Sequence, residues 1–202
     1  MLALNDVWFR YGRRSEWVLR GADLRIPPRG MVALVGPSGS GKSTVLGLLA
    51  GYLRPVRGTV HSAKDEKVGW IFQMSTMLGS RTTLDNIAVS LLAHGISRWE
   101  ARAAAEGLAE RYGLTDVSQH RARTLSGGEL QRLAVARAEA TRSPVLFCDE
   151  PTAQLDAANS ELVAGSLKTL AEAGTVVVVA THDPCVEEAA DAVFRLSNGV
   201  FR

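Results

Sequence analysis

The stretch that most constrains the fold of this 202-residue chain is GPSGSGKST, residues 36–44. It follows a short apolar run, MVALV from Met31, which is typical of a buried strand, and the residues from Lys42 to Ala50 predict a helix. A strand, a glycine-rich turn and a helix in this order are the context of the P-loop motif, which surrounds phosphate groups. We therefore expect a phosphate-binding turn here, rather than a glycine-rich turn that matches the motif by chance.

The chemistry of each P-loop residue type follows from its size and charge. Gly36, Gly39 and Gly41 allow the backbone to wrap closely around phosphates. Lys42 is expected to reach the β- and γ-phosphate oxygens and to assist catalysis, and the Ser43 hydroxyl to ligate Mg²⁺. The candidate nucleotide-contacting residues of the motif are Gly36, Pro37, Ser38, Gly39, Ser40, Gly41, Lys42, Ser43 and Thr44.

The other apolar runs indicate an α/β fold with a mainly parallel sheet flanked by helices. VLFCD from Val145 and TVVVVATH from Thr175 are fully apolar before they end in polar residues, as strands covered on both faces do. The carboxyl ends of parallel strands share one edge of the sheet, so these polar residues are expected to meet the P-loop. Between about residues 83 and 140 the spacing is helical.

The second chemical motif is the acidic pair that ends VLFCDE, residues 145–150. Asp149 is placed to hold Mg²⁺ at the end of its strand. Glu150, one residue further on, is a candidate general base for a water molecule. The alternative is an acidic surface pair with no catalytic role.

The third motif is LSGGE, residues 125–129. Ser126 and Glu129 have the spacing of a capping box at the start of a helix. Gly127 and Gly128 then occupy the first turn, where glycine is an unfavourable choice. Either they serve packing or a flexible entry, or they let an anion approach the helix N-terminus closely.

These three motifs, in this order, resemble those of the nucleotide-binding subunit of an ATP-binding cassette (ABC) transporter, from about Leu2 to Phe201. The segments GISRWEARAAAEGLAERYGL and THDPCVEEAADAVFRLSNG are most similar to the lipoprotein-release and macrolide-export branch. The resemblance implies a single domain over residues 1–202. Its parts are a P-loop NTPase core, an N-terminal antiparallel β subdomain and a helical signature-motif subdomain.

The resemblance also assigns roles outside the P-loop. Tyr11 matches the aromatic residue that stacks on adenine, with Trp17 and Phe9 as competing candidates. Gln73 matches the glutamine that senses Mg²⁺ and the γ-phosphate, and it is assigned to both metal binding and catalysis. His182 matches the histidine that contacts the γ-phosphate.

The same resemblance explains the glycines of the third motif. In the family, Ser126, Gly127 and Gly128 cap the γ-phosphate of an ATP bound by a partner subunit, so that two ATP molecules lie between two chains. The implied ligands are ATP and Mg²⁺, and the implied partners are a second nucleotide-binding subunit, as a homodimer, and integral membrane permease subunits. Met77 and Leu78 are expected to add apolar surface to the region that binds the transmembrane partner.

Composition narrows the function further. A net charge of +2 gives no reason to expect a nucleic acid partner. No apolar run approaches the roughly 18 residues of a membrane span, so we expect a cytoplasmic protein held at the membrane by its partner. The expected function is an ATPase subunit that drives a transporter. The alternatives are a soluble mechanochemical ATPase of the same type, as in iron–sulfur assembly, and a P-loop kinase, which would not explain LSGGE.

Three features depart from the expected branch: a shorter segment before Gln73, Ala153 in the loop AQLD, and Glu139 in place of an apolar residue. The tryptophans, Trp99 among them, are expected to serve packing.

Overall fold

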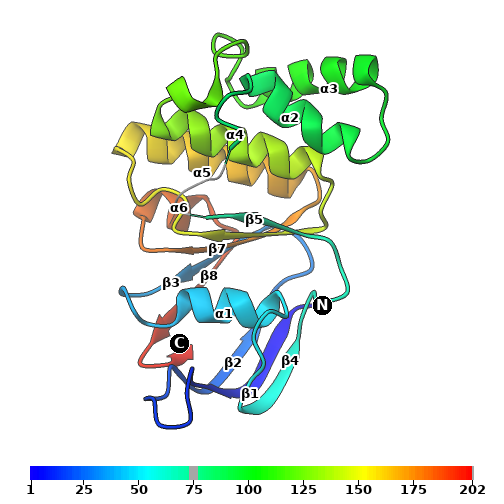
Figure 1. The fold of residues 1–202 in the computed structure, drawn as a ribbon. Helices are drawn as coiled ribbons and strands as arrows, with labels where there is room; N and C mark the ends of the chain where they lie inside the picture. Colours follow the sequence, from blue (N-terminus) through cyan, green and yellow to red (C-terminus); the bar gives the residue numbers. More distant parts are fainter. Residues whose placement is uncertain (73–76, 202) are drawn as a thin grey trace.

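The computed structural model describes residues 1–72 and 77–201, and a six-stranded sheet lies at its centre (Figure 1). The strand order is β5-β6-β7-β3-β8-β9, and all neighbours are parallel except the terminal pair β8 and β9. The prediction of a mainly parallel sheet is therefore confirmed. The strands are β3 (Met31–Val35), β5 (Val68–Ile71), β6 (Val145–Asp149), β7 (Val176–Thr181), β8 (Ala192–Ser197) and β9 (Val200–Phe201).

Helices cover both faces of this sheet (Figure 1). Helix α1 (Lys42–Leu49) lies on one face, and α4 (Gly127–Ala140), α5 (Ala157–Glu172) and α6 (Pro184–Ala189) lie on the other. Because successive strand side chains point to opposite faces, each central strand contributes to two separate cores. Leu146 and Cys148 pack with α4 and α5, whereas Val145 and Phe147 pack with α1.

A second, antiparallel sheet of order β2-β1-β4 packs on the α1 side. Its strands are β1 (Ala3–Phe9), β2 (Leu19–Arg25) and β4 (Arg57–His61). The burial of β2 follows its apolar positions, so one face joins the core and the other meets solvent. The antiparallel N-terminal part expected from the sequence is confirmed.

The remaining helices are α2 (Thr83–Leu92), α3 (Arg98–Arg111) and a 3₁₀ turn, η1 (Ala122–Thr124). Capping boxes begin α2, α3 and α4 at Thr82, Ser97 and Ser126. In each, the side chain at the N-cap and the acidic side chain three residues later satisfy backbone N–H groups that no helical carbonyl reaches.

The structure explains the charge of Glu139 and the exposure of Trp99. The Glu139 carboxylate accepts hydrogen bonds from Arg111 and from the buried Tyr112 hydroxyl, which explains a charged residue at a usually apolar position. The expectation that Trp99 packs in the structure is wrong, since 81% of this residue is exposed. The buried stripe of α3 is instead Ala101, Ala105 and Ala109, at a spacing of one helical turn, and Trp99 lies off that stripe.

Candidate functional site

The P-loop connects β3 to α1, and glycine is required at two of its positions. A Cβ atom at Gly36 would lie 2.3 Å from the Leu196 carbonyl oxygen. Gly41 is the N-cap of α1 and has a φ of 103°, which side-chain-bearing residues rarely adopt. The Lys42 side chain curls back, and its Nζ donates to the carbonyl oxygens of Gly36, at 2.9 Å, and Pro37, at 3.3 Å.

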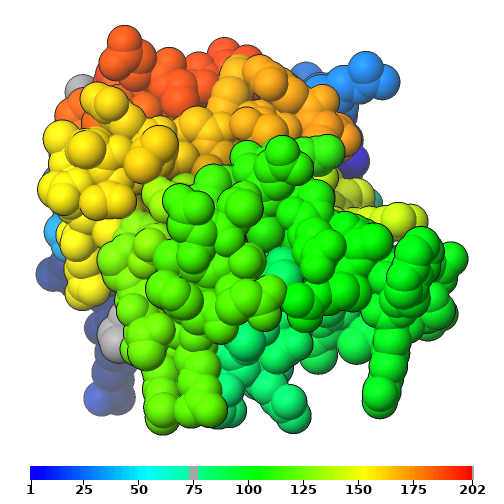
Figure 2. Space-filling model, turned by 90° about the horizontal axis from the view of Figure 1, so that it is seen from above, coloured from blue at the N-terminus to red at the C-terminus, as the bar shows by residue number. Residues whose placement is uncertain are grey.

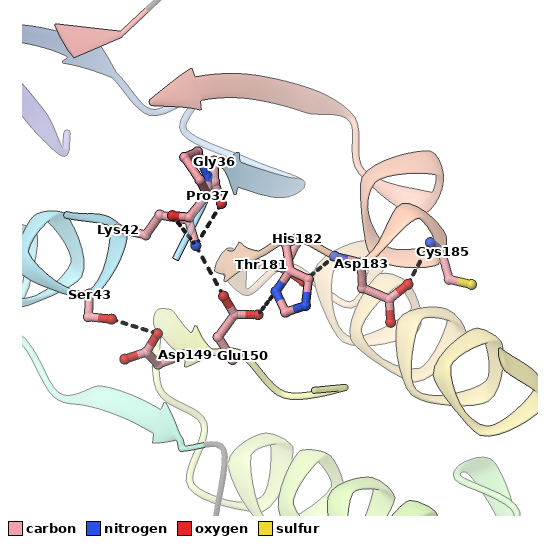
Figure 3. A network of polar contacts seen from close by, with 10 residues as sticks. All are labelled: Gly36, Pro37, Lys42, Ser43, Asp149, Glu150, Thr181, His182, Asp183 and Cys185. Atoms are coloured by element: carbon pink, nitrogen blue, oxygen red, sulfur yellow. Dashed lines mark hydrogen bonds and ion pairs between the residues drawn. The ribbon is translucent and has the colours of Figure 1, made fainter. Parts of the chain in front are cut away.

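A chain of polar contacts joins the P-loop to the ends of β6 and β7 (Figure 3). Lys42 Nζ lies 3.1 Å from Oε1 of Glu150, and the other carboxylate oxygen of Glu150 lies 2.9 Å from Nδ1 of His182. The Lys42 and Glu150 side chains are only 6% and 20% exposed. Glu150 also has a φ of 49°, a left-handed conformation that costs a non-glycine residue energy and is frequent at functional sites.

Beside this chain, Ser43 and Asp149 face each other. The Ser43 Oγ donates a hydrogen bond of 2.9 Å to Oδ1 of Asp149. A hydroxyl oxygen and a carboxylate oxygen are the hard ligands that suit Mg²⁺. The described residues include no group of three His, Cys, Asp or Glu side chains able to hold a metal. The Mg²⁺ assignment therefore depends on this pair and on Gln73, which lies outside the described residues.

The loop after β7 is braced by a carboxylate that the sequence did not single out. Asp183 caps α6, accepting from the Cys185 N–H at 2.9 Å, and its own N–H donates to Oγ1 of Thr181. Burial acts to raise the pKa of Asp183, but the neighbouring Thr152, Ser160 and the Cys185 N–H stabilise the carboxylate more strongly and lower the pKa below its usual value. The sequence did contain a signal for this helix cap, namely an Asp-Pro pair at the start of a helix.

Tyr11 is the aromatic residue open to a nucleotide. It is 68% exposed, and its hydroxyl shares a 2.9 Å hydrogen bond with Oγ1 of Thr44 in the P-loop. Phe9 is buried, and the guanidinium of Arg10 covers the ring of Trp17 at 4.5 Å. Adenine stacking on Tyr11 stays a prediction, and the geometry favours it over the two competitors.

Of the residues Ser126, Gly127 and Gly128, the structure packs Gly128 against the chain's own α5. Ser126 and Gly127 are exposed, but Gly128 is buried, and a Cβ there would lie 2.3 Å from Oδ1 of Asn159. Gly127 has more room, because its nearest neighbour is a flexible Leu155 methyl at 3.2 Å from the position of a Cβ. Packing therefore accounts for Gly128 within one chain, and the approach of a phosphate stays a prediction that depends mainly on Ser126 and Gly127.

The strand–turn–helix cradle, together with two carboxylates at the end of a neighbouring parallel strand, defines the class of P-loop nucleotide-binding proteins. The profile of the family described as ABC transporter matches residues 19–153. The chain belongs to the ABC transporter family.

Similar proteins agree with this membership. An uncharacterized ABC transporter ATP-binding protein of Mycobacterium tuberculosis is 40% identical over 96% of this chain, which spans 64% of that relative's length. The lipoprotein-releasing system ATP-binding protein LolD of Hyphomonas neptunium is 38% identical over 90% of this chain and 87% of its own length. The expected similarity to the lipoprotein-release branch is thus confirmed.

A solved structure extends the likeness to the whole fold. It is a dimeric ATP-binding cassette in a post-hydrolysis state, bound to ADP and phosphate. The two chains are 29% identical and superpose with a TM-score of 0.82 over 100% of this chain and 97% of the other.

Proposed function

We propose that this chain is the ATP-hydrolysing subunit of an ABC transporter, acting as a dimer that drives a separate membrane permease. The observation that carries the proposal is the contact chain from Lys42 through Glu150 to His182, next to the pair formed by Ser43 and Asp149. This arrangement supports roles for Lys42 as a candidate phosphate ligand, Glu150 as a candidate base and Ser43 with Asp149 as a candidate metal pair, because all of them meet at one sheet edge.

In the proposed reaction, the γ-phosphate of ATP replaces Glu150 as a hydrogen-bond acceptor of Lys42. The lysine has three N–H donors, which now serve Gly36, Pro37 and Glu150. When phosphate replaces Glu150, this carboxylate is free to accept a proton from water. The water oxygen then bonds to the γ-phosphorus as the bond to the bridging oxygen breaks, giving ADP and phosphate. His182, on the other carboxylate oxygen, keeps Glu150 oriented.

The proposed Mg²⁺ ligands are Ser43 and Asp149, with Gln73 as the third candidate. A bound Mg²⁺ would neutralise charge on the β- and γ-phosphate oxygens. The donor set fits this role, since both described groups offer oxygen atoms and Mg²⁺ commonly keeps water and phosphate oxygens as its other ligands.

We further propose that Ser126 and Gly127 contact the γ-phosphate bound by a second copy of the chain. Both residues are exposed at the N-terminus of α4, where unpaired N–H groups favour an anion. The dimer seen for the similar cassette bound to ADP and phosphate supports this arrangement. Gly128 lacks a side chain that would hold the phosphate away from the helix backbone. Its packing against Asn159 requires glycine at this position in any case.

Two matched serines provide the test. Ser97 and Ser126 are both N-caps of capping boxes, with glutamate partners at 2.6 and 2.8 Å. Either change to alanine is expected to cost about 1 kcal/mol of stability. Only Ser126→Ala should also lower ATP turnover, by roughly tenfold or more, because a hydrogen bond to phosphate is lost. Equal turnover in the two variants would show that Ser126 is only a helix cap.

Hydrolysis itself is tested by phosphate release from the purified chain. Lys42→Ala is expected to abolish release, and wild-type protein should release phosphate without an added acceptor. A strict requirement for an acceptor molecule would instead favour a P-loop kinase.

The membrane partner is the less direct part of the proposal. In the portion of the chain that the structure describes, no helix is long and apolar enough to cross a bilayer. We propose peripheral binding at the cytoplasmic face of the membrane, through Leu78, which is 46% exposed. Met77 is less suited to binding the membrane partner, because it packs against the helical core and its Sδ accepts a hydrogen bond from Arg137 at 3.0 Å.

A further inference from the structure

The hydroxyl of Ser126 is already used within the chain, although its proposed ligand is a phosphate on a second subunit. Ser126 begins α4, in the part of the chain that forms much of one face of the molecule (residues 83–140, green in Figure 2). Its Oγ donates a hydrogen bond of 2.8 Å to Oε2 of Glu129. A hydroxyl has one proton, and an unprotonated phosphate oxygen can only accept. The Ser126 hydroxyl must therefore turn away from Glu129 before it can bond to a phosphate.

The Glu129 carboxylate is a strong competitor for this proton. Its Oε2 atom also accepts from the Ser126 N–H at 2.7 Å, so one oxygen binds both donors of the serine. The Ser126 N–H holds the pKa of Glu129 below its usual value against the effect of burial, and the Ser126 hydroxyl and the charge of Arg132 act in the same direction. Glu129 is therefore ionised near neutral pH, and an ionised carboxylate accepts more strongly than a neutral group.

A phosphate at Ser126 would also meet the negative charge of Glu129. The carboxylate is one hydrogen bond away from the Ser126 hydroxyl, so a phosphate bonded to the same hydroxyl would lie close to it. Like charges at such a separation repel each other, most strongly where the contact between two subunits excludes water. The closed dimer is therefore more stable if the carboxylate moves toward a positive charge.

Arg132 provides a positive charge on the same helix. It lies three residues after Glu129, a spacing at which helical side chains are neighbours. Its Nε and Nη1 atoms are buried, and neither has a hydrogen-bond partner within residues 1–72 and 77–201. Buried donors without an acceptor cost free energy, and more so when the group is charged. Arg132 would therefore gain from a carboxylate that reaches it.

We propose that the Glu129 carboxylate has two positions: on Ser126 in the free chain, and on Arg132 when Ser126 contacts the phosphate of a partner subunit. The inference rests on the proposed function, and it makes Glu129 and Arg132 positioning residues for the closure of two chains on ATP. In the first position, Glu129 competes with the phosphate. In the second, both Ser126 donors are free, and the phosphate replaces the carboxylate at the helix N-terminus, where negative charge is favourable.

Glu129→Gln tests the first position. Glutamine also forms capping boxes, so the start of the helix is kept while the charge is removed. All variants are made in the Glu150→Gln background to slow hydrolysis, and dimerisation is measured by analytical ultracentrifugation in saturating ATP and Mg²⁺. The protein concentration at half-dimerisation should fall about twofold to thirtyfold, because a partly exposed charged contact stops competing at each of two phosphate sites.

The capping box at the start of α3 provides the matched control. Oε2 of Glu100 accepts from the Ser97 Oγ at 2.6 Å and from the Ser97 N–H at 3.3 Å. Glu100→Gln therefore makes the same change in chemistry and net charge at a helix start with no proposed phosphate, and it should leave dimerisation unchanged. Equal dimerisation of the two variants, or weaker dimerisation of Glu129→Gln, would overturn the inference.

Arg132→Met tests the second position, because methionine keeps an unbranched apolar side chain and removes the donors. It should weaken the dimer about twofold to thirtyfold when Glu129 is present and much less in the Glu129→Gln background, where no carboxylate needs the arginine. Equal losses in the two backgrounds would overturn the inference. Urea melts without nucleotide should show no loss of stability in Arg132→Met. A large loss would mean that the guanidinium is already satisfied in the free chain, which would also overturn it.

The proposed function is judged separately, by ATP turnover of the chain with Glu150 intact. Wild-type turnover without a gain in dimerisation from Glu129→Gln refutes only this inference. Wild-type protein without turnover refutes the proposed function. A Glu150→Gln protein that stays monomeric in ATP refutes the proposed dimer and the inference with it.

Discussion

Replacing Glu150 by glutamine is expected to have two opposite effects: slower hydrolysis and tighter nucleotide binding. Glu150 holds Lys42 through an ion pair of 3.1 Å between two largely buried side chains. A nucleotide phosphate must compete with this carboxylate for the lysine. Glutamine keeps the size of the side chain but removes its charge, so it competes less well.

The size of each effect follows from the contacts. A hydrogen bond to a charged group is worth about 1.5–3 kcal/mol, so the loss of the competitor should tighten nucleotide binding roughly tenfold to 150-fold. Loss of the proposed general base should lower turnover by roughly 10²–10⁴. Binding and turnover should therefore move in opposite directions in one variant.

ADP is the better ligand for the binding assay. Its β-phosphate is expected to reach Lys42, and it lacks the γ-phosphate that a second subunit is proposed to cap, so dimerisation should not contribute to the affinity. Calorimetric titration with ADP would be compared with phosphate release from ATP. The control is His182→Ala, which removes the 2.9 Å contact on the other carboxylate oxygen and leaves the pair with Lys42 in place. It should slow turnover and change ADP affinity by less than about threefold.

The reasoning is refuted if Glu150→Gln binds ADP no more tightly than wild-type protein. Glu150 would then not compete for Lys42 in solution. Weaker binding together with lost turnover would assign Glu150 to holding the P-loop or the metal.

Three other predictions concern stability and reactivity. Glu139→Ala should lower the free energy of unfolding by about 1–3 kcal/mol in urea melts, because Arg111 and the buried Tyr112 hydroxyl both lose their acceptor. Burial raises the pKa of the Cys148 thiol, so the folded chain keeps this proton while the unfolded chain loses it. Stability should be independent of this group below about pH 8.5 and should fall by about 1.4 kcal/mol per pH unit above it, a slope that Cys148→Ala removes. A thiol reagent should label the partly exposed Cys185 in the native protein and reach Cys148 only after unfolding.

The parts of the fold that sequence reasoning predicted are those with local signals. Apolar runs gave β3, β6 and β7, and the capping box at Ser126 gave the start of α4. The meeting of the P-loop with Glu150 followed from one general rule, that parallel strands end at a common edge.

Features that depend on contacts between residues far apart in the sequence could not be predicted. Gly128 is constrained by Asn159, and no pattern within LSGGE indicates which residue of α5 will face it. The exposure of Trp99 depends on which side of α3 is covered, and the alanines of its buried stripe give a weak periodic signal. The charge of Glu139 is explained only by its partners at the end of α3, Arg111 and Tyr112, which are far away in the sequence.

The division of the interior into two cores has a consequence for how such a chain diverges. Val177 and Val179 of β7 face the core beneath α2, α4 and α5, while Val178 and Ala180 face the core around α1. The helices α2, α4 and α5 belong to the first side, and α1, the helix that follows the P-loop, belongs to the second. Substitutions beneath α2, α4 and α5 can therefore be absorbed by repacking on one side of the sheet, while the packing around the helix of the P-loop stays unchanged.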